Sequence, residues 1–139
     1  MPDEMTAPGG EAPPKKVLVC VIDDDAMVRG TICGVLNHAG FATVQASDGD
    51  KGLQVVAQSK PAVVVTDIIM PNREGIETIL ALKAQFPTIG VLAISGSYSP
   101  GPISYLETAQ ALGADDCLAK PFKADELVGK VTRLAARAS

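Results

Sequence analysis

Residues 63–75, VVVTDIIMPNREG, lead a run of apolar residues into one aspartate, Asp67, before Met70, Pro71 and Gly75 end the run. A continuous apolar run rich in β-branched residues is typical of a strand buried on both faces of a sheet. An aspartate at the end of such a strand loses part of its hydration, which is unfavourable unless a partner or ligand compensates its charge. The stretch therefore predicts a buried strand that ends in a functional carboxylate.

The same pattern recurs along the chain, where short apolar runs alternate with amphipathic segments. The predicted strands are residues 17–22, 41–46, 62–66, 90–94 and 115–119, and a helix is predicted after each of them. Apolar runs without alternation are expected where helices cover both faces of a parallel sheet. Since crossovers between parallel strands are right-handed, the pattern favours an α/β fold, a doubly wound five-stranded parallel sheet of the flavodoxin-like order 2-1-3-4-5. Gly40 and Gly113 follow predicted helices, where a left-handed residue is often needed.

The composition excludes several classes of protein. Residues 1–15 are rich in Pro, Gly and acidic residues and lack periodicity, so they are predicted to form a disordered tail before a domain at residues 16–139. No run approaches the roughly 18 apolar residues of a membrane span, and Asp3 and Glu4 stand where a signal peptide has basic residues. We therefore expect a cytoplasmic protein without membrane contact. The net charge of -4 and the absence of Trp argue against direct binding of nucleic acid.

Polar residues follow four of the predicted strands. They are Asp23, Asp24 and Asp25 after the first strand, Asp67 after the third, Ser95 and Gly96 after the fourth, and Lys120 and Pro121 after the fifth. Because the carboxyl ends of parallel strands meet at one edge of a sheet, these residues are expected to lie together. Converging carboxylates repel one another, and a hard divalent cation with oxygen ligands, Mg²⁺ first, relieves the repulsion. No His or Cys lies at these strand ends, which argues against zinc, copper and iron.

This set of residues favours phosphoryl transfer. A metal held by a few carboxylates keeps coordination positions open for a phosphoryl oxygen, and the Lys120 ammonium and the Ser95 hydroxyl would neutralise further charge. Asp67 is then the predicted nucleophile that becomes an aspartyl phosphate. The alternative, that the aspartates are only helix N-caps, suits Asp25 but does not explain why Ser95 and Lys120 end two further strands.

Four motifs in this order carry a family resemblance. VIDDD at residues 21–25, TDIIMP at residues 66–71 with Gly75, ISG at residues 94–96 and LAKPF at residues 118–122 closely resemble a response-regulator receiver domain, and the match covers residues 17–137. The resemblance implies that Asp67 accepts a phosphoryl group from a phosphohistidine on a sensor histidine kinase or phosphotransfer protein. It also implies that phosphorylation switches the binding of an unknown downstream protein partner.

The resemblance further implies a role for each site residue. The Mg²⁺ ligands would be Asp67, Asp24 and the backbone carbonyl of Ile69, and Asp23 would contact the ion through a water molecule. Ser95, followed by Gly96, would take the position of the switch hydroxyl, and Lys120 would bind the phosphate ahead of a cis Pro121. Such a domain is a regulatory phosphoacceptor rather than an enzyme, with self-phosphorylation from a donor and slow self-dephosphorylation as its chemistry.

Two features depart from the family pattern. Cys117 stands where the family usually has Tyr or Phe, whose movement reports phosphorylation. The segment at residues 95–106 is longer than usual and contains two prolines, so we expect the fourth helix to begin late. We therefore predict that signalling runs through residues 95–102 and the fourth helix, with Tyr98 or Tyr105 supplying the aromatic surface.

Two alternative functions remain at this stage. A haloacid-dehalogenase-type phosphatase also uses a strand-end aspartate with Mg²⁺, but it needs a second aspartate two residues later, where this chain has Ile69. A degenerate receiver that acts as a constitutive docking module is opposed by the complete set of Asp67, Ser95 and Lys120 with the aspartates of the first strand. Only the residues RLAARAS remain after the last predicted helix, and no output domain fits in so short a segment, so a free-standing receiver is expected.

Overall fold

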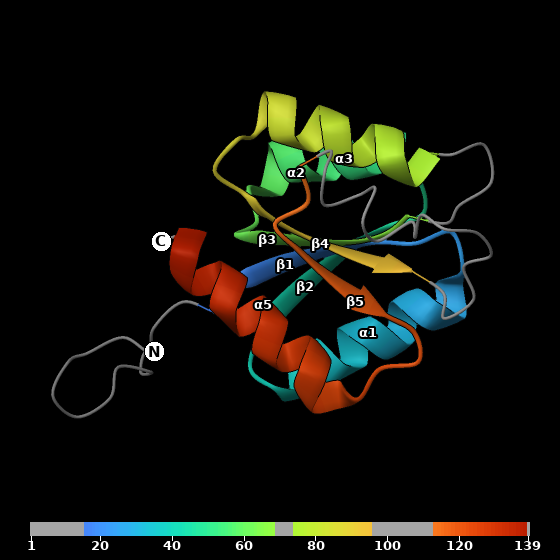
Figure 1. The fold of residues 1–139 in the computed structure, drawn as a ribbon, viewed down its shortest axis with the longest axis vertical. Helices are drawn as coiled ribbons and strands as arrows, with labels where there is room; N and C mark the ends of the chain where they lie inside the picture. Colours follow the sequence, from blue (N-terminus) through green and yellow to red (C-terminus); the bar gives the residue numbers. More distant parts are fainter. Residues whose placement is uncertain (1–15, 69–73, 96–112, 139) are drawn as a thin grey trace, which may run out of the picture.

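Five parallel strands form one sheet in the order β2-β1-β3-β4-β5 (Figure 1). This computed structural model describes residues 16–68, 74–95 and 113–138. The strands are β1 (Leu18–Ile22), β2 (Ala42–Ala46), β3 (Val63–Asp67), β4 (Gly90–Ser95) and β5 (Asp116–Ala119), and the described helices are α1 (Ala26–His38), α2 (Gly49–Ser59), α3 (Glu74–Gln85) and α5 (Ala124–Ala138). The predicted strands and their order are confirmed. The predicted tail and the predicted fourth helix lie outside the described residues.

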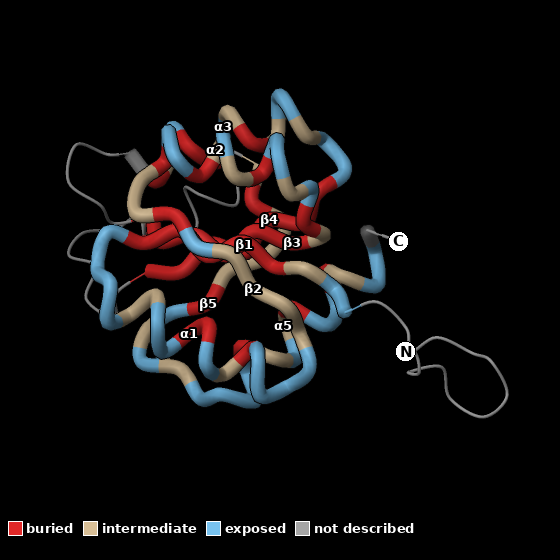
Figure 2. Tube along the Cα trace, turned by 180° about the vertical axis from the view of Figure 1, so that it is seen from behind, coloured by how far each residue is buried: buried red, intermediate tan, exposed pale blue. Residues whose placement is uncertain are grey.

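The sheet is covered on both faces, with α2 and α3 on one side and α1 and α5 on the other (Figure 1). Every residue of β3 and of β4 is buried, and the central strands form the buried layer in Figure 2. This explains why these strands show no alternation of apolar and polar residues, since side chains that point to either face meet a helix layer.

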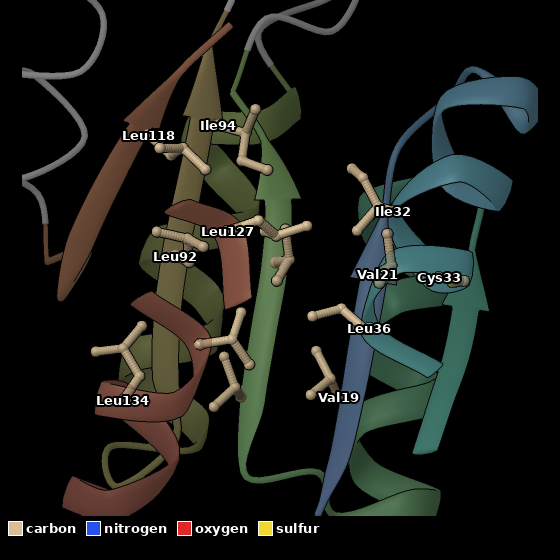
Figure 3. Close-up of a cluster of buried hydrophobic side chains, with 13 residues drawn as sticks. Val19, Val21, Ile32, Cys33, Leu36, Leu92, Ile94, Leu118, Leu127 and Leu134 are labelled. Carbon is tan, nitrogen blue, oxygen red and sulfur yellow. The ribbon is translucent and has the colours of Figure 1, made fainter. Parts of the chain in front are cut away.

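Two hydrophobic clusters fill the space between the sheet and its helices. Successive residues of β1 point to opposite faces, so Val19 and Val21 belong to the cluster beneath α1 and α5 and Cys20 belongs to the cluster beneath α2 and α3. Figure 3 shows the first cluster, where Leu127 and Leu134 of α5 meet β3 and β4. Burial of one such leucine contributes roughly 1.5–3 kcal/mol, so α5 is fixed to the sheet by its apolar face.

The helix ends follow the local chemistry of the sequence. Asp25 caps α1, because its Oδ1 accepts hydrogen bonds from Met27 N at 2.9 Å and from Val28 N at 3.3 Å. Gly40 and Gly113 have φ angles of 104° and 122°, which confirms that the chain needs left-handed residues at these two positions. The N-cap interpretation of Asp25 is also confirmed.

All three thiols of the chain are free. Cys20 and Cys33 are buried and Cys117 is half-buried, as is common for cysteines that serve as small apolar residues. Across the described ranges, no helix is long and apolar enough to cross a membrane.

Candidate functional site

The strand register brings the predicted site residues to one edge of the sheet. Asp67 ends β3 opposite Ile94 of β4, so Ser95 lies one residue further along the neighbouring strand. Lys120 follows β5, and its backbone N–H donates to the Ser95 carbonyl at 2.7 Å. Asp23 follows β1 on the other side of β3, and its N–H donates to a carbonyl of β2 at 3.2 Å. The four residues come from four strands and meet because parallel strands end together.

One ammonium group is shared by two carboxylates. Lys120 Nζ lies 3.2 Å from Asp67 Oδ2 and 3.8 Å from Asp23 Oδ2. The carboxylates are deeply placed, since the side chain of Asp23 is 3% exposed and that of Asp67 is 9% exposed. Two negative charges face one positive charge, so the pocket carries an excess of negative charge when both aspartates are ionised.

The buried, crowded position of Asp23 changes its protonation. The pKa of Asp23 is raised to about 6, chiefly by burial and next by the nearby Asp67 carboxylate, while Lys120 acts to lower it. The Asp25 N–H, which donates to Asp23 Oδ1 at 2.9 Å, acts in the opposite direction and lowers the pKa. A carboxylate in this state binds a proton or another cation readily.

The donor set fits Mg²⁺. Asp23 and Asp67 offer buried carboxylate oxygens, and the excess negative charge favours a hard cation that takes oxygen ligands. Within residues 16–68, 74–95 and 113–138, no three His, Cys, Asp or Glu side chains are already grouped so that they could hold one metal ion. Asp24 is exposed on the same loop, and Ile69 lies outside the described residues. Water would have to complete the coordination, as is usual for Mg²⁺.

An arginine that the sequence did not single out fixes the acidic loop. Arg29 Nη1 donates to the Asp23 carbonyl at 2.6 Å, and Arg29 Nε donates to Gln45 Oε1 at 3.2 Å. The side chain thus ties the loop after β1 to helix α1 and to strand β2. No sequence pattern indicates this contact, because it depends on where a long side chain of α1 reaches in the folded protein.

The other predicted residues come from the ends of β4 and β5 and from β5 itself. Ser95 is 1% exposed at the end of β4, and the Lys120–Pro121 peptide bond is cis. Cys117 pairs with Ala93 in the register of β4 and β5 and packs against the cluster beneath α2 and α3. Burial, followed by the charge of the neighbouring aspartate, raises the pKa of the Cys117 thiol, which therefore stays protonated. Gly96 lies outside the described residues.

An apolar groove adjoins the site. Its volume is about 650 Å³, and it is lined by Met27, Val28, Thr31, Ile32, Lys120, Pro121 and Phe122. Met27, at the rim of the groove, is 81% exposed. Because Lys120 lines both the groove and the carboxylate pocket, the two form one continuous surface.

Comparison with known proteins adds independent information. Residues 19–132 match the family model of the response regulator receiver domain. The chain is 32% identical over 123 residues to response regulator MprA of Mycobacterium sp. (strain KMS), an alignment that covers 88% of this chain and 52% of the relative. The chain thus spans about half the length of the curated relatives it matches.

Solved structures show the same fold. The crystal structure of the receiver domain of NtrX from Brucella abortus is similar with a TM-score of 0.77 and 32% identity, covering 85% of this chain and 98% of that one. A putative response regulator from Chloroflexus aurantiacus is similar with a TM-score of 0.79 and 28% identity, covering 88% of this chain and 99% of that one.

Proposed function

The chain belongs to the response-regulator receiver domain family, and from this membership we propose that it accepts a phosphoryl group on Asp67 from a phosphohistidine of a partner protein. Domains of this family are regulatory parts of two-component signalling, and they interact with histidine kinases and downstream effectors. The observation that carries the proposal is the Lys120 ammonium, 3.2 Å from Asp67 Oδ2, beside a second buried carboxylate.

The proposed reaction moves one phosphoryl group. A carboxylate oxygen of Asp67 attacks the phosphorus while the bond between phosphorus and the donor histidine nitrogen breaks. The electron pair of the broken bond stays on the ring nitrogen, so a histidine protonated on its other nitrogen leaves as neutral imidazole. The product is an acyl phosphate on Asp67.

The neighbouring groups have separate tasks. Lys120 exchanges its contact with Asp67 for one with an oxygen of the phosphoryl group, which offsets the charge that the new dianion brings. The Ser95 hydroxyl lies one residue beyond the partner of Asp67 in β4, and we assign it the switch contact with the phosphate. Asp23, Asp24, Asp67 and the Ile69 carbonyl are the proposed Mg²⁺ ligands. When bound, Mg²⁺ neutralises charge on the phosphoryl oxygens.

We assign the groove beside Lys120 to the protein that carries the phosphohistidine. A donor that brings its phosphohistidine to Asp67 must cover the adjoining surface, and that surface is the apolar groove between Met27 and Phe122. Partners with an apolar helix face fit such a groove. We also propose that the protein works in the cytoplasm and that its downstream partner is another protein. Direct contact with nucleic acid or membrane is not part of the proposal.

Intact-mass measurement tests the proposal. Incubation with Mg²⁺ and acetyl phosphate should add one phosphoryl group to the wild-type chain and none to Asp67→Asn. Asp25→Asn is the matched control, because asparagine caps a helix as well as aspartate does and the change removes a carboxylate from the same edge. Incorporation that survives in Asp67→Asn would disprove the assignment.

The same samples separate the two alternative functions. A constitutive docking module would take up no phosphoryl group at all, with or without Mg²⁺. A phosphatase of the haloacid-dehalogenase type would release many equivalents of phosphate from a phosphomonoester. The receiver proposal expects neither result.

A further inference from the structure

The first turn of α3 presses against the backbone that carries Asp67. A methyl group built on Gly75 would lie 2.5 Å from the Asp67 carbonyl oxygen, 2.5 Å from Ile68 Cα and 2.8 Å from the Ile68 carbonyl carbon. Real Cβ atoms essentially never lie within 3.0 Å of a non-bonded heavy atom, so no side chain fits at Gly75 without a shift of backbone. The neighbouring atoms all belong to the backbone of the phosphoacceptor strand end.

The torsion angles of Gly75 do not require glycine. Gly40 and Gly113 are the described glycines with positive φ, and Gly75 is an ordinary helical residue of α3. Alanine forms helices better than glycine does, so the local preference of α3 would favour a side chain here. The close approach to Asp67 and Ile68 is therefore the reason that glycine is needed.

Neither side of this contact can yield easily. Ile68 N donates to the Ile94 carbonyl at 2.9 Å, which fixes the strand end to β4. Helix α3 is held in turn by Ile79 and Leu82, which are fully buried in the same cluster as Ile68. Two packed elements thus meet at one point, where an added methyl group must move either the helix or Asp67.

We propose that Gly75 is a positioning residue for phosphorylation, because it sets how far the Asp67 carboxylate stands from Lys120 and Asp23. This inference rests on the proposed function of Asp67. A shift of Asp67 by a fraction of an ångström alters its 3.2 Å contact with Lys120 and its line of approach to a phosphoryl donor. Misplacement of about 1 Å can slow a reaction by about 100-fold.

Two alanine variants separate positioning from simple crowding. Gly75→Ala crowds the strand end that carries Asp67, whereas Gly90→Ala crowds Leu134 Cβ at 3.0 Å, at the opposite end of the sheet. The rate of phosphoryl incorporation from acetyl phosphate is measured at saturating Mg²⁺ and divided by the folded fraction from urea unfolding. We expect Gly75→Ala to be slower by about 10-fold or more and Gly90→Ala to stay within about twofold of wild type.

The affinity for Mg²⁺ is a second measurement, and steric crowding far from Asp67 should not change it. Isothermal titration calorimetry with Mg²⁺ alone should show weaker binding in Gly75→Ala and unchanged binding in Gly90→Ala. Both variants are also made in a stabilised background with Gly34→Ala and Gly129→Ala, where nothing lies within 4 Å of the added methyl group. This background keeps enough folded protein even if Gly75→Ala is strongly destabilising.

The outcomes distinguish the inference from the proposed function. Phosphorylation of Gly75→Ala at the wild-type rate per folded molecule, with Mg²⁺ binding unchanged, would overturn the positioning role while leaving Asp67 as the phosphoacceptor. An equal slowing in Gly90→Ala would overturn it too, because crowding far from the site would then suffice. Failure of the wild-type chain itself to take up a phosphoryl group would instead overturn the proposed function.

Discussion

Ion pairs lie at both ends of the parallel strands, and they differ in how completely the negative charge is compensated. We call the side of the sheet where the strands begin the amino edge and the side where they end the carboxyl edge. At the amino edge, one carboxylate is fully engaged: Asp115 Oδ2 accepts from Lys83 Nζ at 3.0 Å and from Val91 N at 2.8 Å. Arg137 Nη2 lies 3.7 Å from Asp115 Oδ1, and Lys83 also donates to two backbone carbonyls at 3.1 and 3.4 Å. This cluster ties α3, α5, β4 and β5 together and leaves no excess negative charge.

At the carboxyl edge, two carboxylates share one cation. Lys120 contacts both Asp67 and Asp23, and the pKa of Asp23 is raised first by burial and then by the neighbouring Asp67 carboxylate. A cluster whose carboxylates are compensated by cations stabilises the fold. A cluster with more carboxylates than cations destabilises it and favours the binding of a further cation. The comparison teaches that the balance of charge, rather than the presence of an ion pair, separates a structural cluster from a candidate functional one.

The largest effect is expected where the two edges differ in chemistry. Lys120→Ala should slow phosphoryl incorporation by about 100-fold, because it removes the cation that meets the phosphoryl oxygens. Lys83→Ala, the matched change at the amino edge, should leave the rate per folded molecule unchanged. Incorporation from acetyl phosphate, followed by intact mass, measures both. Equal rates in the two variants would mean that Lys120 is no more than a surface charge.

A second effect concerns stability as a function of pH. The pKa of Asp23 is raised from 3.8 to about 6 in the folded protein, so the stability that its protonation contributes is present below about pH 4 and is lost as pH rises through about 6. Asp23→Asn cannot ionise and keeps an acceptor for the Asp25 N–H. Without Mg²⁺ at pH 8, it should be more stable than wild type by about 2 kcal/mol.

Urea unfolding between pH 4 and pH 8 with a chelator present tests this expectation. The difference between wild type and Asp23→Asn should shrink as pH falls. The matched control is Asp50→Asn, which removes an exposed carboxylate from α2. Parallel pH profiles for wild type and Asp23→Asn would contradict the raised pKa of Asp23.

A smaller loss of stability is expected at the amino edge. Lys83→Met removes the ammonium that joins Asp115 to two carbonyls but keeps the apolar part of the side chain, so the free energy of unfolding should fall by about 1 kcal/mol. Lys51→Met is the control, since Lys51 is 65% exposed and lies 3.9 Å from its acidic neighbour Asp48. A Lys83 variant as stable as the Lys51 variant would show that the amino-edge cluster contributes little.

Much of the fold was predictable because it depends on local patterns. The buried runs, the helices between them and the right-handed crossovers left one favoured strand order, and that order is confirmed. The meeting of Asp67 with Lys120 followed from the same reasoning, since both residues end parallel strands. Strand ends are visible in a sequence as the points where an apolar run stops.

Other features of the site were hidden because they depend on tertiary geometry. The strand pattern alone does not distinguish the burial of Asp23 from that of Asp24, whereas the structure buries Asp23 and exposes Asp24. Arg29 reaches the Asp23 carbonyl from a helix, and Gly75 touches the strand end across a connection of several residues. Such contacts depend on how helices sit on the sheet, which residue periodicity does not specify.

The smallest effect is expected at Cys117, where the family usually has an aromatic residue. Its half-buried thiol packs on the face beneath α2 and α3, and the predicted signalling segment, residues 95–102, lies largely outside the described residues. Cys117→Ala removes one sulfur atom from β5, so we expect a loss of stability of about 0.5 kcal/mol. The equivalent change Cys20→Ala, at a fully buried position beneath the same helices, should be more destabilising.

The rate of phosphorylation should not depend on the Cys117 thiol. A small side chain in β5 has neither the reach nor the area to follow a phosphoryl group on Asp67, so Cys117→Ala should be phosphorylated within about twofold of the wild-type rate. Amide hydrogen exchange with and without beryllium fluoride should then show the same change in both proteins, centred on residues 95–106. A tenfold slower rate in Cys117→Ala, or changes confined to β5, would place the thiol in the switch and contradict signalling through residues 95–102.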